Sequence, residues 1–258
     1  MTEALTLKGG WSTGFKSPTL LEMTPAWMQI SCGGGCYLVG NEDLDPEDSD
    51  SFEVGLRYEQ GPLSGNITAF RNDIDDMIQF PPARTNDIAL APTYDNFVGF
   101  NADGLPMFAY QNIESARTQG VEIAASYEIN DDWTVGANYT YLDAKNTTDG
   151  LDAPLAYQPE HSANLAIDWR ATEKLNLNLT VSYSGSQYTY VPTNGDMEFA
   201  HKVKAYTTAD ILASYQINDN FSARLGVLNL ANEEITREVS DDFNVEGRRY
   251  YASLTGRF

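Results

Sequence analysis

The sequence predicts an all-β protein whose antiparallel strands cross a membrane as part of the wall of a β-barrel. Three observations predict this class. Apolar and polar side chains alternate along many segments, short and long connections alternate strictly, and aromatic residues gather at the ends of the expected strands. We expect about ten strands, each near the roughly 9–11 residues that a tilted strand needs to cross a bilayer.

The alternation is clearest between Leu175 and Tyr183, where apolar residues alternate with asparagine, threonine and serine. Successive side chains of a strand point to opposite faces, so this segment has one apolar and one polar face. A helix would instead repeat its apolar residues every three or four positions. The same alternation predicts strands at residues 5–11, 52–58, 63–69, 121–127, 133–141, 163–169, 209–215, 221–227 and 250–258.

The connections separate two architectures that the alternation leaves open. A soluble β-sandwich also alternates along its strands, but it has no reason to sort its loops by length. Outer-membrane barrels have short turns on one side of the membrane and long loops on the other. Because short and long connections alternate along this chain, both chain ends are expected on the side of the short turns. Tight turns are expected at residues 59–62, 130–132, 171–174 and 218–220, and long segments at 17–49, 75–117, 143–160, 185–204 and 231–247.

Aromatic residues at strand ends fit the belts that membrane proteins place at the two interfaces, whereas the alternative is an ordinary β-core. No run approaches 18 consecutive apolar residues, so a membrane-spanning helix is not expected. The aromatic residues are Tyr58, Tyr127, Trp133, Tyr141, Trp169, Tyr183, Tyr215, Phe221 and Phe258.

Charge and motif content narrow the function. The chain has 37 acidic and 16 basic residues and a formal charge of -21, which argues against binding nucleic acid because phosphates require clustered Lys and Arg. It has no nucleophile motif, no glycine-rich phosphate loop and no paired histidine and carboxylate. We therefore expect neither an enzyme nor a bound cofactor.

A series of short sequence blocks is more specific than the alternation. It begins with Gly10 to Pro18 and continues with Asn41 to Glu47 and with residues 52–56. Later blocks occupy residues 70–74, 118–122, 138–141, 227–232 and 247–251. In this order the blocks resemble the TonB-dependent outer-membrane receptors across nearly the whole chain.

This resemblance implies a barrel of about 22 strands closed around an amino-terminal plug. Residues 1–258 would then form the carboxyl-terminal portion, without the plug and the first half of the barrel. We expect a fragment that does not transport alone, since an incomplete barrel leaves two unpaired strand edges in lipid. The implied location is the outer membrane of a Gram-negative bacterium. The implied partners are outer-membrane lipid, the barrel assembly machinery, and the TonB complex through the absent amino-terminal part.

Within the family, Cys32, three glycines, Cys36 and the following block at Asn41 most resemble the ferric enterobactin receptors, and the block at Gly247 is similar to the colicin I receptor. This implies transport of a ferric siderophore of the catecholate type, with iron as cargo. The alternatives are a receptor for haem or cobalamin, or a porin-like channel that needs no energy. Cys32 and Cys36 can close a small disulfide in an oxidising compartment. A metal site is not expected, because both histidines lie far away in the sequence.

An iron-loaded catecholate is anionic and carries planar rings, so aromatic and cationic side chains at the external mouth are the expected ligand contacts. Packing within the loops is the alternative for each of them. The strongly acidic chain would repel an anion unless its positive groups are focused. The candidates in the long segments are Arg84, Tyr94, Phe97, Tyr110, Arg117, Tyr190, Lys202 and Arg237.

Overall fold

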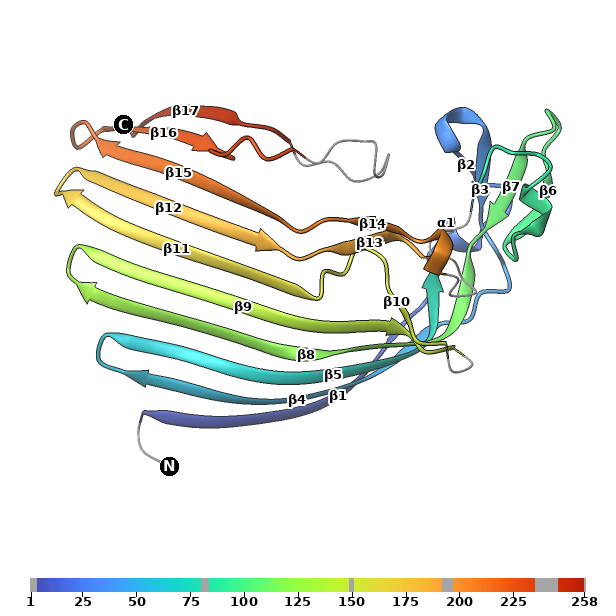
Figure 1. Cartoon of the computed structure of the whole chain (residues 1–258), viewed down its shortest axis with the longest axis horizontal. Helices are drawn as coiled ribbons and strands as arrows, with labels where there is room; N and C mark the ends of the chain where they lie inside the picture. Colours follow the sequence, from blue (N-terminus) through green and yellow to red (C-terminus); the bar gives the residue numbers. More distant parts are fainter. Residues whose placement is uncertain (1–3, 80–83, 149–150, 192–196, 235–245, 258) are drawn as a thin grey trace.

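A computed structural model describes residues 4–79, 84–148, 151–191, 197–234 and 246–257. One large antiparallel sheet dominates this part of the chain (Figure 1). Its strands follow one another in sequence order, and the two-residue strand β10 (Ala153–Pro154) pairs with β9. The sheet runs in the order β1 (Leu5–Lys16), β4 (Glu47–Gln60), β5 (Leu63–Gln79), β8 (Gln111–Asn130), β9 (Trp133–Asn146), β11 (His161–Thr172), β12 (Leu175–Ser184), β15 (Tyr206–Gln216), β16 (Phe221–Leu228) and β17 (Arg249–Gly256).

All ten predicted strands are present, and each pairs with its neighbours along the chain. The predicted boundaries were too short on the side of the long loops. β5 has 17 residues and β8 has 20, so both extend well into the segment 75–117 that the sequence predicted to be a connection. The extensions carry charged residues on the face that is apolar in the rest of the strand, which ends the hydrophobic alternation but not the backbone pairing.

Cross-strand register gives the sheet one apolar and one polar face. Leu179 lies between Ile167 of β11 and Ile211 of β15, whereas Asn178 on the other face donates a 2.8 Å hydrogen bond to Asp168. The polar face is hollowed by about 580 Å³, with a lining of mostly small and polar residues that includes Asn138. A barrel lumen is polar and its outer band is apolar, so the hollowed face is the lumen side of the wall.

The two ends of the wall differ as the loop lengths predicted. Figure 1 shows the short turns at one end together with both ends of the chain, and the long connections at the opposite end. At the turn end, Trp133 and Trp169 stack with their ring centroids 4.8 Å apart. Nearer the loop end, Trp11 and Phe52 stack at 6.3 Å on the apolar face. These pairs fit aromatic belts at two membrane interfaces.

Two lumen-facing glycines differ in what surrounds them. A Cβ added at Gly120 would lie 2.0 Å from the carbonyl oxygen of Tyr141 and 3.1 Å from the ring of Phe70. At Gly136 the nearest atom would be 3.9 Å away. The close approach of the Tyr141 carbonyl therefore explains why a glycine stands in the block at residues 118–122.

The long connections contain a second sheet that the sequence did not predict. It joins β2 (Met28–Ser31), β3 (Cys36–Val39), β7 (Pro106–Ala109) and β6 (Phe97–Phe100) in that order. Because β3 and β7 pair in parallel, the first two external loops form one unit. Short helical turns are α1 (Leu20–Met23), η1 (Cys32–Gly34), η2 (Ala91–Thr93) and η4 (Met197–Phe199). No helix in the described ranges is long and apolar enough to cross a membrane.

The short helix α1 is held by a capping box. The Thr19 hydroxyl accepts from the Glu22 amide at 3.3 Å, and the Glu22 carboxylate accepts from the Thr19 amide at 2.7 Å. Partial burial alone would raise the pKa of Glu22, but the hydrogen bonds from Thr19 and the charge of Lys16 lower it below its ordinary value. The box fixes the point at which the chain leaves β1 for the external sheet.

Candidate functional site

The disulfide between Cys32 and Cys36 closes the tight loop that joins β2 to β3, with the two Cα atoms 5.4 Å apart. Gly33 and Gly34 have φ values of 63° and 97°, which favour glycine. Gly35 lacks a side chain for another reason, because a Cβ there would lie 2.6 Å from Cβ of Asn86. The loop therefore requires glycine for two reasons: a positive φ at Gly33 and Gly34, and a close neighbour at Gly35.

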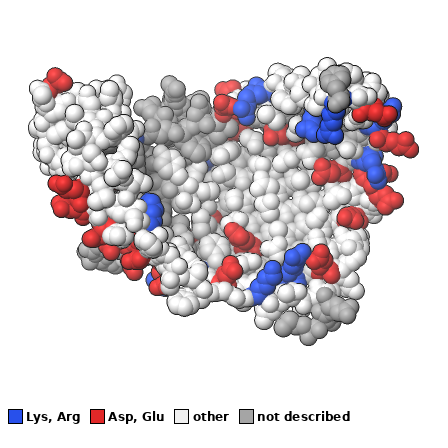
Figure 2. Space-filling view, turned by 180° about the vertical axis from the view of Figure 1, so that it is seen from behind, with Lys and Arg blue, Asp and Glu red and all other residues white. Residues whose placement is uncertain are grey.

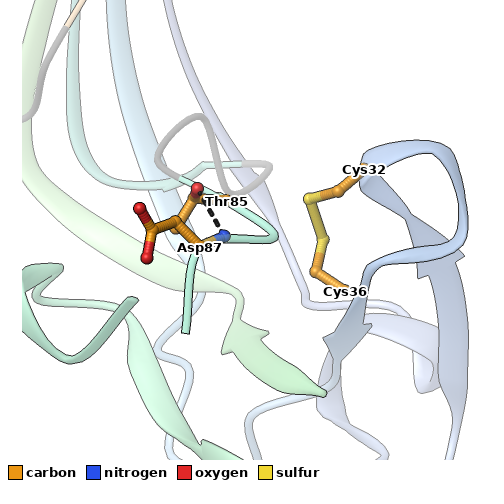
Figure 3. Close-up of a disulfide and its surroundings, with 4 residues drawn as sticks. All are labelled: Cys32, Cys36, Thr85 and Asp87. Carbon is orange, nitrogen blue, oxygen red and sulfur yellow. Dashed lines mark hydrogen bonds between the residues drawn. A yellow bond between two sulfur atoms is a disulfide. The ribbon is translucent and has the colours of Figure 1, made fainter. Parts of the chain in front are cut away.

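Figure 3 shows the disulfide beside the segment that holds Thr85 and Asp87. The Asp87 amide donates to the Thr85 hydroxyl at 3.0 Å, and the Asp87 carboxylate accepts from the amides of Ala89 and Leu90 at 2.8 and 3.2 Å. The segment therefore turns back into η2 at a defined point. Because residue 86 packs against Gly35, the disulfide loop and this segment support each other.

Two aromatic candidates pack against the core of the external sheet. Cys36, Leu38, Ala91 and Phe108 form that core and are almost completely buried, and Tyr94 and Phe97 lie partly buried against it. The ring of Phe108 is 5.9 Å from Tyr94 and 6.0 Å from Phe97, centroid to centroid. Both candidates therefore help to hold the external sheet together.

Tyr110 lies where the external sheet joins the wall, and it is only 7 % exposed between Leu44 and Ile78. Its carbonyl oxygen accepts a 3.1 Å hydrogen bond from the Asn41 side chain. Burial and the nearby carboxylate of Glu22 raise the pKa of its phenol above the ordinary value. Its surroundings favour a packing role over ligand contact.

The hairpin of β13 (Gln187–Tyr190) and β14 (His201–Val203) presents a different arrangement. Lys202 stands opposite Tyr188 in register, and its ammonium lies 5.1 Å from the centre of the Tyr188 ring. Lys202 is exposed and, within the described residues, forms no ion pair. The Tyr188 carbonyl accepts a 2.7 Å hydrogen bond from the Tyr157 amide, which ties the hairpin to the preceding loop.

The remaining candidates are dispersed. Tyr190 pairs in register with His201, which places its backbone in the same hairpin. Arg117 belongs to β8 and faces the apolar side of the wall, where it forms a 2.6 Å ion pair with Asp73. Arg84 begins a described segment and is partly exposed, and Arg237 lies outside the described residues. The structure thus groups Tyr94 with Phe97 and places Lys202 beside Tyr188.

One supporting residue of the loop end had no signal in the sequence. The Asn112 side chain accepts from the Asp45 amide at 2.9 Å and donates to the Asp45 carbonyl at 3.0 Å. These residues are 67 positions apart, so local patterns do not reveal the contact. The paired hydrogen bonds link the start of β8 to the acidic segment before β4.

The family model described as "TonB dependent receptor-like, beta-barrel" matches residues 1–230 of this chain. The chain belongs to the TonB-dependent receptor family. An iron-regulated outer membrane virulence protein of Vibrio cholerae is 32% identical over 251 residues, which cover 96% of this chain and 36% of that protein. The ferric enterobactin receptor PirA of Pseudomonas aeruginosa is 30% identical over 275 residues, covering 99% and 35%. The chain therefore spans about a third of these relatives.

Solved structures agree with the family assignment. A variant of the ferric enterobactin receptor PfeA of Pseudomonas aeruginosa superposes on the whole chain with a TM-score of 0.77 at 26% identity, and the match covers 39% of that receptor. The vitamin B12 transporter BtuB of Photobacterium profundum is 29% identical over 258 residues, covering 36% of its length. PirA and PfeA are named as ferric enterobactin receptors and BtuB as a vitamin B12 transporter, so the names of these relatives differ in the ligand that they give.

Proposed function

We propose that this chain is the carboxyl-terminal barrel wall of an outer-membrane receptor that takes up a ferric siderophore of the catecholate type. The family, its outer-membrane location and the likeness to two ferric enterobactin receptors support this proposal. Transport changes the location of the ferric chelate and not its covalent structure, so the chain acts as a receptor and not as an enzyme. Uptake is energised by the TonB complex through parts of the receptor beyond these residues.

The observation that carries the ligand class is the pair of Tyr188 and Lys202 on the external hairpin. An exposed ammonium beside an aromatic ring can interact with an anionic group and with a planar ring of the same ligand. A ferric catecholate offers both. Because the chain has a formal charge of -21, a cation such as Lys202, which has no acidic partner among the described residues, can draw an anion locally.

The lumen side of the wall suits passage better than chemistry. Figure 2 shows one face of the molecule, on which charged residues gather mainly at the margins and the broad middle is mostly uncharged. The hollow on the lumen side is lined largely by glycine, alanine, serine and asparagine, and its charged lining residues are Lys8, Glu53 and Arg57. The small side chains that make up most of the lining leave room for a ligand to pass.

The test is the uptake of iron-labelled ferric catecholate by a receptor-deleted strain that carries the full-length gene. We expect Lys202→Gln and Tyr188→Leu each to weaken uptake at low ligand concentration about tenfold, since such contacts are worth about 0.5–2 kcal/mol. Lys174→Gln, in the turn at the other end of the wall, is the matched control and should transport normally. Normal uptake by both hairpin variants would remove the observation on which the ligand class rests.

A cobalamin receptor is the second candidate, because the similarity to a vitamin B12 transporter is nearly as high as that to the iron receptors. Labelled cyanocobalamin, offered to the same strain, separates the two. Uptake of cobalamin without uptake of the iron chelate would replace the siderophore proposal. Iron uptake that persists without the TonB complex would instead indicate a porin-like channel.

A further inference from the structure

The strand at one edge of the sheet is joined to its neighbour by a long connection. β17 lies beside β16 (Figure 1), and residues 229–248 connect the two strands. A tight turn fixes the register of a hairpin, whereas a connection of this length leaves the register open. Something other than a turn must therefore set the register of β17.

The side chains of β17 specify its register only in part. Tyr250, Ala252 and Leu254 face outward with the apolar residues of β16, and the residues between them face the lumen. A slip by one residue would exchange the two faces, but a slip by two would keep every apolar residue on the outward face. Alternation therefore excludes an odd slip and permits an even one.

Asn229, the first residue after β16, is only 5% exposed. Its side-chain amide donates to the carbonyl oxygens of Glu233 at 2.7 Å and Glu246 at 2.9 Å, and its side-chain oxygen accepts from the Glu233 amide at 2.8 Å. Its backbone amide donates to the Asp210 carboxylate of β15 at 2.7 Å. One asparagine thus joins the beginning of the connection to its end and ties both to β15.

Asn232 adds a second link between the two ends of the connection. Its side-chain oxygen accepts from the Arg248 amide at 2.7 Å, and the Arg248 guanidinium donates to the Leu230 carbonyl. Gly247 leaves room for this contact, since a Cβ there would lie 3.0 Å from the side-chain oxygen of Asn232. These bonds lie directly beyond the last pair of the ladder between β16 and β17.

Both positions favour asparagine over other polar residues. Asn229 and Asn232 have φ values of 51° and 54°, a left-handed conformation that asparagine tolerates better than most residues. Asn229 also needs donors for two carbonyls and an acceptor for an amide, which a carboxylate cannot supply. A slip of two residues would move β17 by about 6.8 Å, which separates Glu246 and Arg248 from their partners. Such a slip would leave buried polar groups unpaired, which is unfavourable.

We infer that Asn229 and Asn232 set the register in which β17 joins the wall, and that this is the role of asparagine in the block at residues 227–232. A barrel closes only at a fixed stagger of its strands, so a displaced β17 would present its other edge at the wrong height. The role is in assembly of the receptor. It is independent of the nutrient and of the proposed ligand contacts.

The test is disulfide cross-linking of the full-length receptor in outer membranes, oxidised with copper phenanthroline. Leu225→Cys with Ala252→Cys reports the native register, because these residues stand opposite each other. Leu225→Cys with Leu254→Cys or with Tyr250→Cys reports a slip of two residues in either direction. We expect only the first pair to link when Asn229 is present, and Asn229→Gly to lower the ratio of native to slipped links about tenfold. An unchanged ratio would overturn the inference.

The variants separate the side-chain bonds from the backbone conformation. Asn229→Gly keeps the left-handed backbone accessible and removes only the side-chain bonds. Asn229→Asp keeps the size of the side chain but cannot donate when ionised, so we expect the same change in the ratio. Asn218→Gly is the matched control, because the Asn218 side chain accepts only from the amides of Asn220 and Phe221 within one tight turn. It should leave the ratio at the wild-type value.

A second measurement decides the case in which Asn229→Gly does not reach the outer membrane. A two-residue Asn-Gly turn replaces residues 229–248, and such a turn fixes the register of a hairpin by itself. We expect this receptor to assemble and to form the link between positions 225 and 252 although it lacks both asparagines. Failure of both receptors to assemble would show that the connection is needed for a reason other than register, which would overturn the inference.

Discussion

Replacing Leu179 with arginine tests which face of the wall meets lipid. Leu179 is the fifth residue of β12, and its cross-strand neighbours are Ile167 and Ile211. With a rise of about 3.4 Å per residue and a tilt of about 40°, it lies about 10 Å above the start of the strand. The apolar band of a barrel is about 25 Å tall, so Leu179 lies near its middle.

At that depth an arginine on the lipid face costs about 2–4 kcal/mol. Asn178→Arg is the matched control, one residue away on the lumen face, where the new guanidinium would meet the carboxylate of Asp168. We expect its cost to stay below about 1 kcal/mol, because the lumen is hydrated and the ion pair is partly exposed. The two variants differ by one position, so the comparison isolates the facing of the side chain.

The assay is reversible unfolding of the complete receptor in lipid vesicles by guanidinium chloride, followed by tryptophan fluorescence. The free energy of unfolding of Leu179→Arg should fall below that of Asn178→Arg by at least about 1 kcal/mol. Equal losses for the two variants, or a larger loss for Asn178→Arg, would show that the register or the inside–outside assignment of the wall is wrong.

Three further predictions concern local features. In receptor purified from outer membranes, non-reducing mass spectrometry should find Cys32 and Cys36 linked by a disulfide, and two free thiols would contradict this. Changing both to serine should lower the free energy of unfolding by at most about 2 kcal/mol, because the closed loop is short. The lowered pKa of Glu22 means that its carboxylate stabilises α1 above its ordinary pKa of 4.5 and that this contribution is lost as the pH falls through the lower folded-state value. Hydrogen exchange in α1, corrected for intrinsic rates, should therefore quicken in acid, and Glu22→Gln should remove that pH dependence. Gly120→Ala should destabilise the wall by about 1–3 kcal/mol in the same unfolding assay, whereas Gly136→Ala should change it by no more than about 1 kcal/mol; equal effects would show that the carbonyl beside Gly120 moves away easily.

The sequence by itself determined the ten wall strands, their two faces and the end at which the chain begins and finishes. Alternation of side chains is a local property, and consecutive antiparallel strands joined by short turns need no long-range information to pair. The disulfide of Cys32 and Cys36 was equally accessible, since the two residues are four positions apart and separated only by glycine. The alternation, the short turns and the disulfide share a short separation along the chain, whereas β1 and β4, in which Lys16 pairs with Glu47, are joined by a long connection.

Only the tertiary structure decided how the long loops fold and which of their residues pack within the loops instead of being exposed to a ligand. The parallel pairing of β3 with β7 joins segments about 70 residues apart, and it turns Tyr94 and Phe97 into packing residues of the external sheet. An aromatic residue in a loop has the same local sequence whether it meets a ligand or a core, because burial depends on distant partners. Arg117 is a second example, because the sequence predicted it in a long loop. The structure places it in β8 opposite Asp73, so it forms an ion pair on the outer surface of the wall.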